Sequence, residues 1–305
     1  MKRWIVYQRE RFPLAGHAPL VAAFSISAVC FSHLLRRQEG WPEATTLIVA
    51  FVTALLFFLL LRISDEFKDF EDDSRYRPYR PVPRGLVTLR ELAWIGLGAG
   101  TIQFALAIWL DPALVWLLLL AWGYLAIMSR EFFVPEWLKA RPSIYLASHM
   151  VIIPLIDLYA TACDWLVAEL SRPPDGLYLF LLVSFFNGIV VEVGRKIRAP
   201  EDEERGVETY SAVWGMRRAI IVWLLAAVTT AVFAWLAARQ IRFEQPMLWL
   251  LVALLIACAA IAIRFLRRPA KGAGKAIEVA SGVWTLVMYL GLGAVPVLVT
   301  GGPLS

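Results

Sequence analysis

Nine apolar stretches alternate with polar segments along the chain, and each is long enough to cross the roughly 30 Å hydrocarbon layer of a membrane as a helix. The expected spans are residues 17–35, 44–63, 92–110, 113–129, 144–167, 177–194, 217–237, 247–265 and 277–299. The third and fourth spans are joined only by Leu110-Asp111-Pro112, which is typical of a tight turn. The pattern predicts an all-α, polytopic membrane bundle that forms one domain over residues 1–305.

The composition supports the same class of protein. Hydrophobic residues make up 59 % of the 305 residues and charged residues 18 %, a balance too apolar for a soluble core with a polar coat. The cysteines, Cys30, Cys163 and Cys258, lie inside apolar runs without metal-ligand spacing, so we interpret them as buried hydrophobic residues and expect no disulfide framework. The basic segment 1–12 lacks a small-residue cleavage site, and no signal peptide is expected.

Lys and Arg are distributed unevenly between the two ends of the predicted spans. With the N-terminus inside, 25 of the 30 cationic residues lie in inner segments. Because cytoplasmic loops carry an excess of Lys and Arg, this bias places the N-terminus and the two longest charged loops in the cytoplasm and the C-terminus on the opposite side. We expect an integral, multi-pass protein of a bacterial inner membrane. The net charge of +5 follows from this topology and does not indicate nucleic-acid binding.

The first charged loop follows directly on the second span. Six carboxylates fall within residues 65–73. If the helix continues past the span, Asp65, Asp69, Asp72 and Asp73 share one face, which repels itself unless a cation binds there. Oxygen ligands without His or Cys suit Mg²⁺. The alternative is a solvated loop held by surface ion pairs, but the position at the end of a membrane span favours a functional role.

Cationic residues accompany both charged loops. Three arginines follow the acidic run and suit phosphate oxygens, namely Arg77, Arg80 and Arg84. At the end of the sixth span, Glu192, Arg195 and Lys196 are spaced at i, i+3 and i+4. They therefore share one helical face and can pair with one another or jointly contact a ligand.

The two loops carry recognisable motifs. The first reads Asp65-Glu66-x-x-Asp69-x-x-x-Asp73, followed by Arg80-Pro81-x-x-x-Gly85, and the second ends in Gly206-x-x-Thr209. These motifs resemble the two signatures of the UbiA superfamily of intramembrane prenyltransferases, N-D-x-x-D-x-x-x-D with R-P-x-x-x-G, and D-x-x-x-D with G-x-x-S/T. Nine predicted spans, with the loops after the second and sixth, also match that family's architecture. Asp65 stands where the family has Asn, and Glu66 where it has Asp.

The second motif departs further from the family pattern. Asp202 falls at the later Asp of D-x-x-x-D, whereas Arg198 falls at the earlier one, and Glu192 with Lys196 offers only an E-x-x-x-K substitute. A second Mg²⁺ would meet net positive charge there, which Coulomb repulsion disfavours. We therefore expect Arg195 and Lys196 to contact diphosphate oxygens directly, with Glu192 orienting them.

The resemblance implies a helical bundle around a central cavity that opens sideways to lipid. It also implies transfer of an isoprenyl group from a prenyl diphosphate, held through Mg²⁺, to a lipophilic acceptor, which we expect to be aromatic. The implied metal ligands are Asp65, Glu66, Asp69, Asp72 and Asp73, and the implied catalytic residues are Asp65, Asp69, Asp73, Arg195 and Lys196. The expected substrate-binding residues are Arg77, Arg80, Arg84, Glu192, Arg198, Asp202, His149, Asn187 and Tyr145. The expected partners are the prenyl diphosphate, the acceptor and the lipid bilayer; no nucleic acid is expected, and the sequence indicates no protein partner.

The fifth span contains further ionisable residues. His149 and Asp157 are eight residues apart and lie close to one helical face. Each either lines the acceptor cavity or forms an interhelical hydrogen bond, because ionisable groups inside a membrane are costly unless they bind something. Asp164 lies near the outer surface, where we expect a structural role.

Two other functions remain open. A membrane terpene cyclase of the same superfamily would ionise the same diphosphate and quench the cation internally. A transporter would place its ionisable groups near the bilayer midplane at discontinuous helices. Here they crowd one membrane face, which favours the enzyme.

Overall fold

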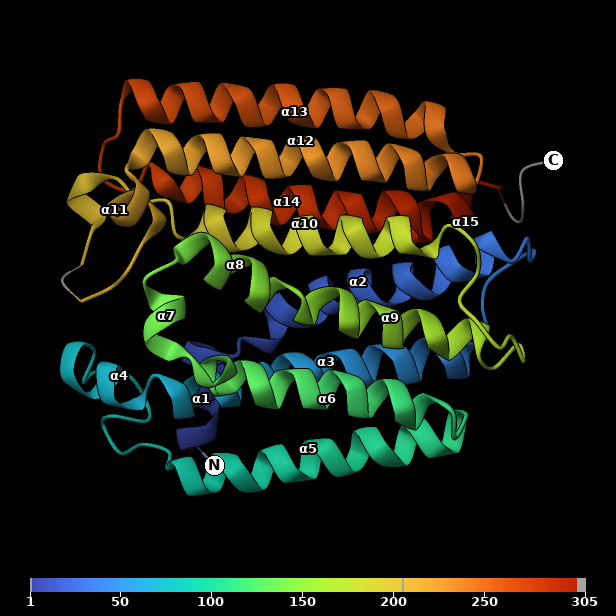
Figure 1. The fold of residues 1–305 in the computed structure, drawn as a ribbon, viewed down its shortest axis with the longest axis horizontal. Coiled ribbons are helices and arrows are strands. Elements are labelled where there is room, and N and C mark those ends of the chain that lie inside the picture. Colours follow the sequence, from blue (N-terminus) through green and yellow to red (C-terminus); the bar gives the residue numbers. More distant parts are fainter. Residues whose placement is uncertain (1, 205, 301–305) are drawn as a thin grey trace.

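The computed structural model describes residues 2–204 and 206–300, which consist of helices and their connections (Figure 1). The elements on the N-terminal side are α1 (Lys2–Arg11), α2 (Leu14–Leu35), α3 (Ala44–Lys68), α4 (Phe70–Tyr76), α5 (Leu89–Leu110), α6 (Leu114–Ser129), the 3-10 turn η1 (Glu131–Phe133), α7 (Pro135–Lys139), α8 (Pro142–Met150) and α9 (Ile152–Trp165). The remaining elements are α10 (Leu177–Arg195), the 3-10 turn η2 (Pro200–Asp202), α11 (Tyr210–Trp214), α12 (Met216–Gln240), α13 (Glu244–Arg267), α14 (Gly274–Leu292) and α15 (Ala294–Thr300).

The predicted all-helical membrane architecture is confirmed. Within the described residues, eight helical stretches are long and apolar enough to cross a membrane, and α6 is a shorter apolar helix beside them. The expectation of about nine spans is therefore met, with α6 as the short fourth one. Many large apolar side chains point outward, and Trp116 is 76 % exposed. Such exposure suits a surface that faces lipid rather than water.

Two predicted spans are interrupted. The fifth is divided at Val151 into α8 and α9. Pro154 accounts for this break, because it has no amide proton to donate to the carbonyl of Met150. The ninth is divided at Gly293, where a Cβ atom would lie 2.3 Å from the carbonyl oxygen of Ser27. The close approach of two backbones there admits only glycine, and α14 gives way to α15.

Successive spans run in opposite directions, so the charged loops collect at one end of the bundle. Figure 1 shows α4, α7 and α11 together at its left end, while α15 lies at the other end. The loops that follow α3 and α10 are therefore neighbours in space. Gly206 in the second loop confirms this, since its Cα lies against Tyr76 so closely that a Cβ would come within 2.4 Å of the ring.

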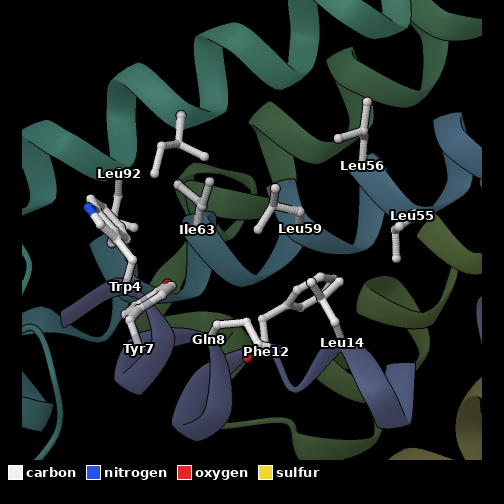
Figure 2. Close-up of a pocket in the computed structure, with 11 residues that line it drawn as sticks. Trp4, Tyr7, Gln8, Phe12, Leu14, Leu55, Leu56, Leu59, Ile63 and Leu92 are labelled. Carbon is white, nitrogen blue, oxygen red and sulfur yellow. The ribbon is translucent and has the colours of Figure 1, made fainter. Parts of the chain in front are cut away.

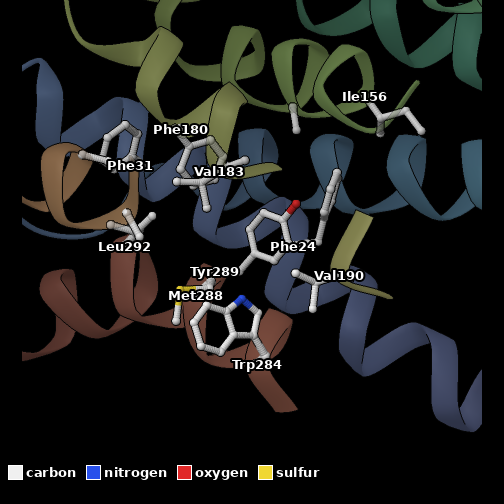
Figure 3. Packing of buried hydrophobic residues seen from close by; sticks show 14 of the residues in the cluster. Phe24, Phe31, Ile156, Phe180, Val183, Val190, Trp284, Met288, Tyr289 and Leu292 are labelled. Atoms are coloured by element: carbon white, nitrogen blue, oxygen red, sulfur yellow. The ribbon is translucent and has the colours of Figure 1, made fainter. Parts of the chain in front are cut away.

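The interior of the bundle is packed mainly with apolar and aromatic side chains. Figure 3 shows Phe24 of α2, Phe180 of α10 and Tyr289 of α14 in contact, and the ring centroids of Phe24 and Tyr289 are 5.0 Å apart. These side chains tie the N-terminal, middle and C-terminal helices into one core. The central cavity implied by the sequence motifs stays a prediction.

The N-terminal helix α1 lies beside the acidic end of α3 and the first turns of α5. Together these helices border an apolar groove, in which Tyr7 and Phe12 face Leu59 and Ile63 (Figure 2). Tyr7 and Ile63 also belong to a small buried cluster separate from the main core. This cluster fixes α1 next to the acidic end of α3.

Candidate active site

The first acidic motif forms the junction between α3 and α4. The expected continuous helix is interrupted at Asp69, where φ is −92° and ψ is 6°. The backbone still follows a helical path, because the amide of Asp69 donates to the backbone carbonyl of Asp65 at 2.9 Å and the amide of Asp73 donates to that of Asp69 at 2.8 Å. As a result Glu66 and Asp73 turn into the protein, with exposures of 2 % and 3 %, whereas Asp65 and Asp69 are half-buried. Asp72 is exposed.

Arginine side chains neutralise the two buried acids. Glu66 forms a salt bridge with Arg11 of α1. Asp73 contacts Arg77 at 3.0 Å and Arg80 at 2.5 Å. Arg77 and Arg80, which the sequence assigned to phosphate, are thus paired within the motif itself.

Arg84 is also engaged by the protein. Its guanidinium contacts Glu10 of α1 at 2.9 Å and donates to the carbonyl of Tyr79 at 3.0 Å. A diphosphate would have to compete with these partners. The role of these arginines toward a substrate stays a prediction.

Asp65 and Asp69 are the partly buried acids of this motif that remain available to a cation. Asp65 contacts Arg62 at 3.4 Å, and within the described residues no ion pair or hydrogen bond of the Asp69 side chain is found. Burial raises the pKa of Asp69, and the neighbouring Asp65 raises it further, while Lys68 lowers it. A bound cation would stabilise both carboxylates. No preformed cluster of three or more metal-binding side chains occurs within residues 2–204 and 206–300. The pair nevertheless fits Mg²⁺, which proteins commonly hold with one or two carboxylates plus substrate phosphates.

The cations of the second motif are arranged as the spacing predicted. Glu192 contacts Arg195 at 2.6 Å and Lys196 at 2.9 Å. Lys196 also lies over the ring of Tyr210, with its Nζ 5.6 Å from the centroid. The second motif also lies next to the first, since Gly206 packs against the ring of Tyr76. The two motifs therefore oppose positive charge to negative charge at one end of the bundle.

The rest of the second loop is occupied with its own structure. Arg198 contacts Glu204 at 3.2 Å and donates to the carbonyl of Asp202 at 3.3 Å. The Asp202 carboxylate accepts a hydrogen bond from the amide of Gly272 at 2.7 Å, so it joins this loop to the connection between α13 and α14. Thr209 caps the short helix α11 by accepting a hydrogen bond from the amide of Ala212 at 3.1 Å.

A second polar cluster adjoins the first motif and includes two residues that the sequence analysis missed. Lys68 contacts Glu131 at 2.5 Å and donates to the hydroxyl of Tyr145 at 2.5 Å. His149 contacts Glu131 at 3.3 Å, and its ring stacks on that of Tyr145 with centroids 3.9 Å apart. Tyr145 and His149 were predicted to bind substrate, whereas Lys68 and Glu131 were not. Their only sequence signal is that both are charged residues at the inner ends of spans.

The deeper polar residues are buried between helices. The hydroxyl of Tyr289 donates to Asp157 at 3.1 Å and contacts that of Ser184 at 3.1 Å. For Asp157 the structure thus shows the interhelical hydrogen bond, the second of the two alternatives. Asn187 is 1 % exposed, and within the described part of the chain neither polar atom of its side-chain amide has a hydrogen-bond partner.

Asp164 has a structural role, as expected. It accepts hydrogen bonds from Ser32 at 2.7 Å and from Arg36 at 2.7 and 2.8 Å, which joins α9 to α2.

Comparisons with known proteins agree with this architecture. The model of the UbiA prenyltransferase family matches residues 23–284, so the chain belongs to that family. The digeranylgeranylglyceryl phosphate synthase of Thermococcus kodakarensis is 27 % identical over 205 residues, which cover 66 % of this chain and 68 % of the relative.

Solved structures share the fold at low sequence identity. The apo structure of a UbiA homolog from Aeropyrum pernix superposes with a TM-score of 0.64 at 13 % identity, covering 92 % of this chain and 97 % of the homolog. The structure of a UbiA homolog from Archaeoglobus fulgidus bound to DMAPP and Mg²⁺ gives a TM-score of 0.55 at 12 % identity, covering 94 % and 98 %. These chains therefore share the helical architecture predicted for this one.

Proposed function

We propose that this chain is a Mg²⁺-dependent intramembrane prenyltransferase, which transfers an isoprenyl group from a prenyl diphosphate to a lipophilic acceptor. The observation that carries the proposal is that the half-buried pair Asp65 and Asp69 and the cations Arg195 and Lys196 belong to loops that meet at the same end of an apolar bundle. Membership of the UbiA prenyltransferase family supports the reaction class. The Archaeoglobus fulgidus homolog, bound to DMAPP and Mg²⁺, supports the metal and the diphosphate.

In this proposal the acidic residues bind the metal, and the cationic residues bind the diphosphate and assist its departure. Asp65 and Asp69 would hold Mg²⁺, which would supply positive charge to the diphosphate leaving group. Arg195 and Lys196 bind the same leaving group, and Glu192 orients them. Negative charge grows on the diphosphate as the carbon–oxygen bond breaks, so fixed cations stabilise the transition state more than the bound substrate.

The apolar bundle serves the organic part of the substrate. An allylic carbocation must be kept from water until it meets the acceptor, and aromatic ring faces attract it. Tyr145 lies beside the polar end of the bundle and forms part of the cluster that adjoins Asp69. We assign it, with His149, to the boundary between the diphosphate and the prenyl chain.

We consider two classes of lipophilic acceptor. The sequence resemblance favours an aromatic acceptor, whereas the relatives synthesise, by their name, digeranylgeranylglyceryl phosphate. Both classes are lipophilic and would reach the protein from the bilayer.

We also propose that the N-terminus and both motif loops lie in the cytoplasm. The excess of Lys and Arg in these segments supports this orientation.

The test incubates purified protein with labelled prenyl diphosphates and Mg²⁺, with and without a membrane lipid extract, and then with single aromatic or glyceryl phosphate acceptors. A prenylated product that depends on acceptor and is lost with a chelator is expected. Acceptor-free hydrocarbon or terpene alcohol would indicate the cyclase instead. Absence of diphosphate release under every condition would contradict the proposal and favour a transporter.

A further inference from the structure

The connection between α6 and α7 contains an unusual backbone. Glu131, Phe132 and Phe133 have φ values of 50°, 53° and 60°, three consecutive non-glycine residues in the left-handed region. L-residues visit this region as single residues and rarely in series, because the Cβ atom approaches the following carbonyl. Such strain persists only where surrounding contacts hold it, and it gathers at functional sites.

The contacts that hold this turn are made by its first two side chains. The carboxylate of Glu131, 6 % exposed, contacts Lys68 at 2.5 Å and His149 at 3.3 Å, and accepts a hydrogen bond from Tyr145 at 3.1 Å. The ring of Phe132 packs edge-on against His149, with centroids 5.9 Å apart. The left-handed turn thus directs a buried acid toward the end of α3 and the inner end of α8.

Glu131 carries a full negative charge near neutral pH. Burial alone would raise its pKa, but the contacts with His149 and Lys68 outweigh burial and lower the pKa to about 2. The carboxylate is therefore a permanent partner for the Lys68 ammonium.

Lys68 has a second acid within reach. It precedes Asp69 in the chain and interacts electrostatically with it. Asp65 lies one helical turn before Asp69, whose amide donates to the carbonyl of Asp65 at 2.9 Å. Without Glu131 the flexible Lys68 side chain would be drawn to these carboxylates and would neutralise the pair that faces the metal.

We propose that Glu131 is a positioning residue, which holds the Lys68 ammonium away from Asp69 and so keeps Asp65 and Asp69 free for the divalent cation. The inference rests on the proposed function of that pair. Packing alone does not require the strained turn. In this proposal the turn serves to place the Glu131 carboxylate beside Lys68.

The test compares Glu131→Gln with the wild type. Gln keeps the size of the side chain and part of its hydrogen bonding but removes the charge. The readout is calorimetric binding of Mg²⁺ in the presence of an unreactive prenyl thiodiphosphate, alongside the melting temperature in detergent. Metal affinity should fall about tenfold or more in the variant, because the Lys68 ammonium would then compete with Mg²⁺ for the carboxylates.

A double variant separates positioning from general damage. If Lys68 causes the loss, then Glu131→Gln combined with Lys68→Met should recover much of the metal affinity, although it removes a second member of the cluster. A merely structural Glu131 predicts the opposite, a further loss. Glu136→Gln is the matched control, since Glu136 is an exposed acid in the next helix, and its binding should equal that of the wild type.

The outcomes distinguish the two proposals. If the wild type binds Mg²⁺ with the analogue, and Glu131→Gln binds it equally well or the double variant is the weakest, the positioning role is wrong and the prenyltransferase proposal stands. If the wild type binds no Mg²⁺ with any prenyl thiodiphosphate, the metal-dependent function fails, and this inference fails with it.

Discussion

The guanidinium of Arg195 lies 2.6 Å from one oxygen of the Glu192 carboxylate, one helical turn earlier on α10. Lys196 occupies the other oxygen at 2.9 Å. Both oxygens are therefore engaged by cations, and the cluster keeps a net positive charge. A second divalent ion would have to displace these cations, so the second motif is suited to bind the diphosphate directly.

This arrangement predicts the effects of two alanine variants. Arg195→Ala and Lys196→Ala should each weaken prenyl diphosphate binding and also lower kcat, by about 10²-fold, because the leaving charge that these cations stabilise is largest in the transition state. Steady-state kinetics with a purified acceptor would measure both parameters. A change confined to KM would show that the cations bind substrate without assisting ionisation.

Glu192 provides the comparison. Glu192→Gln should cost less activity than Asp69→Asn, because it loses an orienting partner and leaves the metal site intact. Equal loss of Mg²⁺-dependent binding in the two variants would make Glu192 a metal ligand and would contradict the cationic interpretation of the second motif.

Asp69→Ala should abolish turnover and leave the fold intact. The Asp69 side chain is half-buried and forms no salt bridge with the residues that the structure describes, so its removal leaves none of them as an unpaired buried partner. Activity and the melting temperature should be measured on the same preparation. Full activity would remove Asp69 from the site, and a large drop in melting temperature would show that it is structural instead.

The membrane orientation can be tested by cysteine labelling in cells. Ser74 and Gln38 are both exposed and lie at opposite ends of the bundle, whereas Cys30, Cys163 and Cys258 are buried and should react slowly. An impermeant thiol reagent applied outside should label Gln38→Cys and spare Ser74→Cys until the membrane is opened. The reverse pattern would overturn the positive-inside assignment.

Local spacing along one helix was the most informative part of the sequence. Glu192, Arg195 and Lys196 are neighbours because α-helical geometry alone brings i, i+3 and i+4 together. The nine apolar stretches predicted the spans from equally local information. The length and hydropathy of a segment decide whether it can cross a membrane, whichever segments it packs against.

Contacts between distant segments could not be predicted in this way. Glu131 and Lys68 are 63 positions apart in the sequence, and their contact depends on a left-handed turn. The residues of that turn are not glycines, so the sequence does not indicate it. Glu66 was expected to bind metal because its position matches the motif, but its partner in the structure is Arg11, 55 residues earlier. Spacing gives the composition of a site, whereas tertiary packing decides which charges are already satisfied.

The pairing of Arg11 with Glu66 yields the last prediction. Arg11 and Glu66 are both largely buried, and Arg11 also lies 4.0 Å from Asp73. Arg11→Ala would leave Glu66 as a buried acid without its partner, which typically costs about 3 kcal/mol of stability. The melting temperature in detergent should fall accordingly, and Arg11→Ala with Glu66→Gln should recover part of the loss because position 66 then no longer carries an unpaired buried charge.

Divalent ions distinguish the two roles open to Glu66. If Glu66 can act as a metal ligand once Arg11 is gone, Mg²⁺ should raise the melting temperature of Arg11→Ala more than that of the wild type, since a ligand stabilises the folded state it binds. The double variant should lack this extra response. Arg9→Ala is the control, because Arg9 is exposed on the same helix, and its melting temperature should match the wild type with and without Mg²⁺. An unchanged melting temperature in Arg11→Ala would mean that the salt bridge does not hold α1 against the acidic motif.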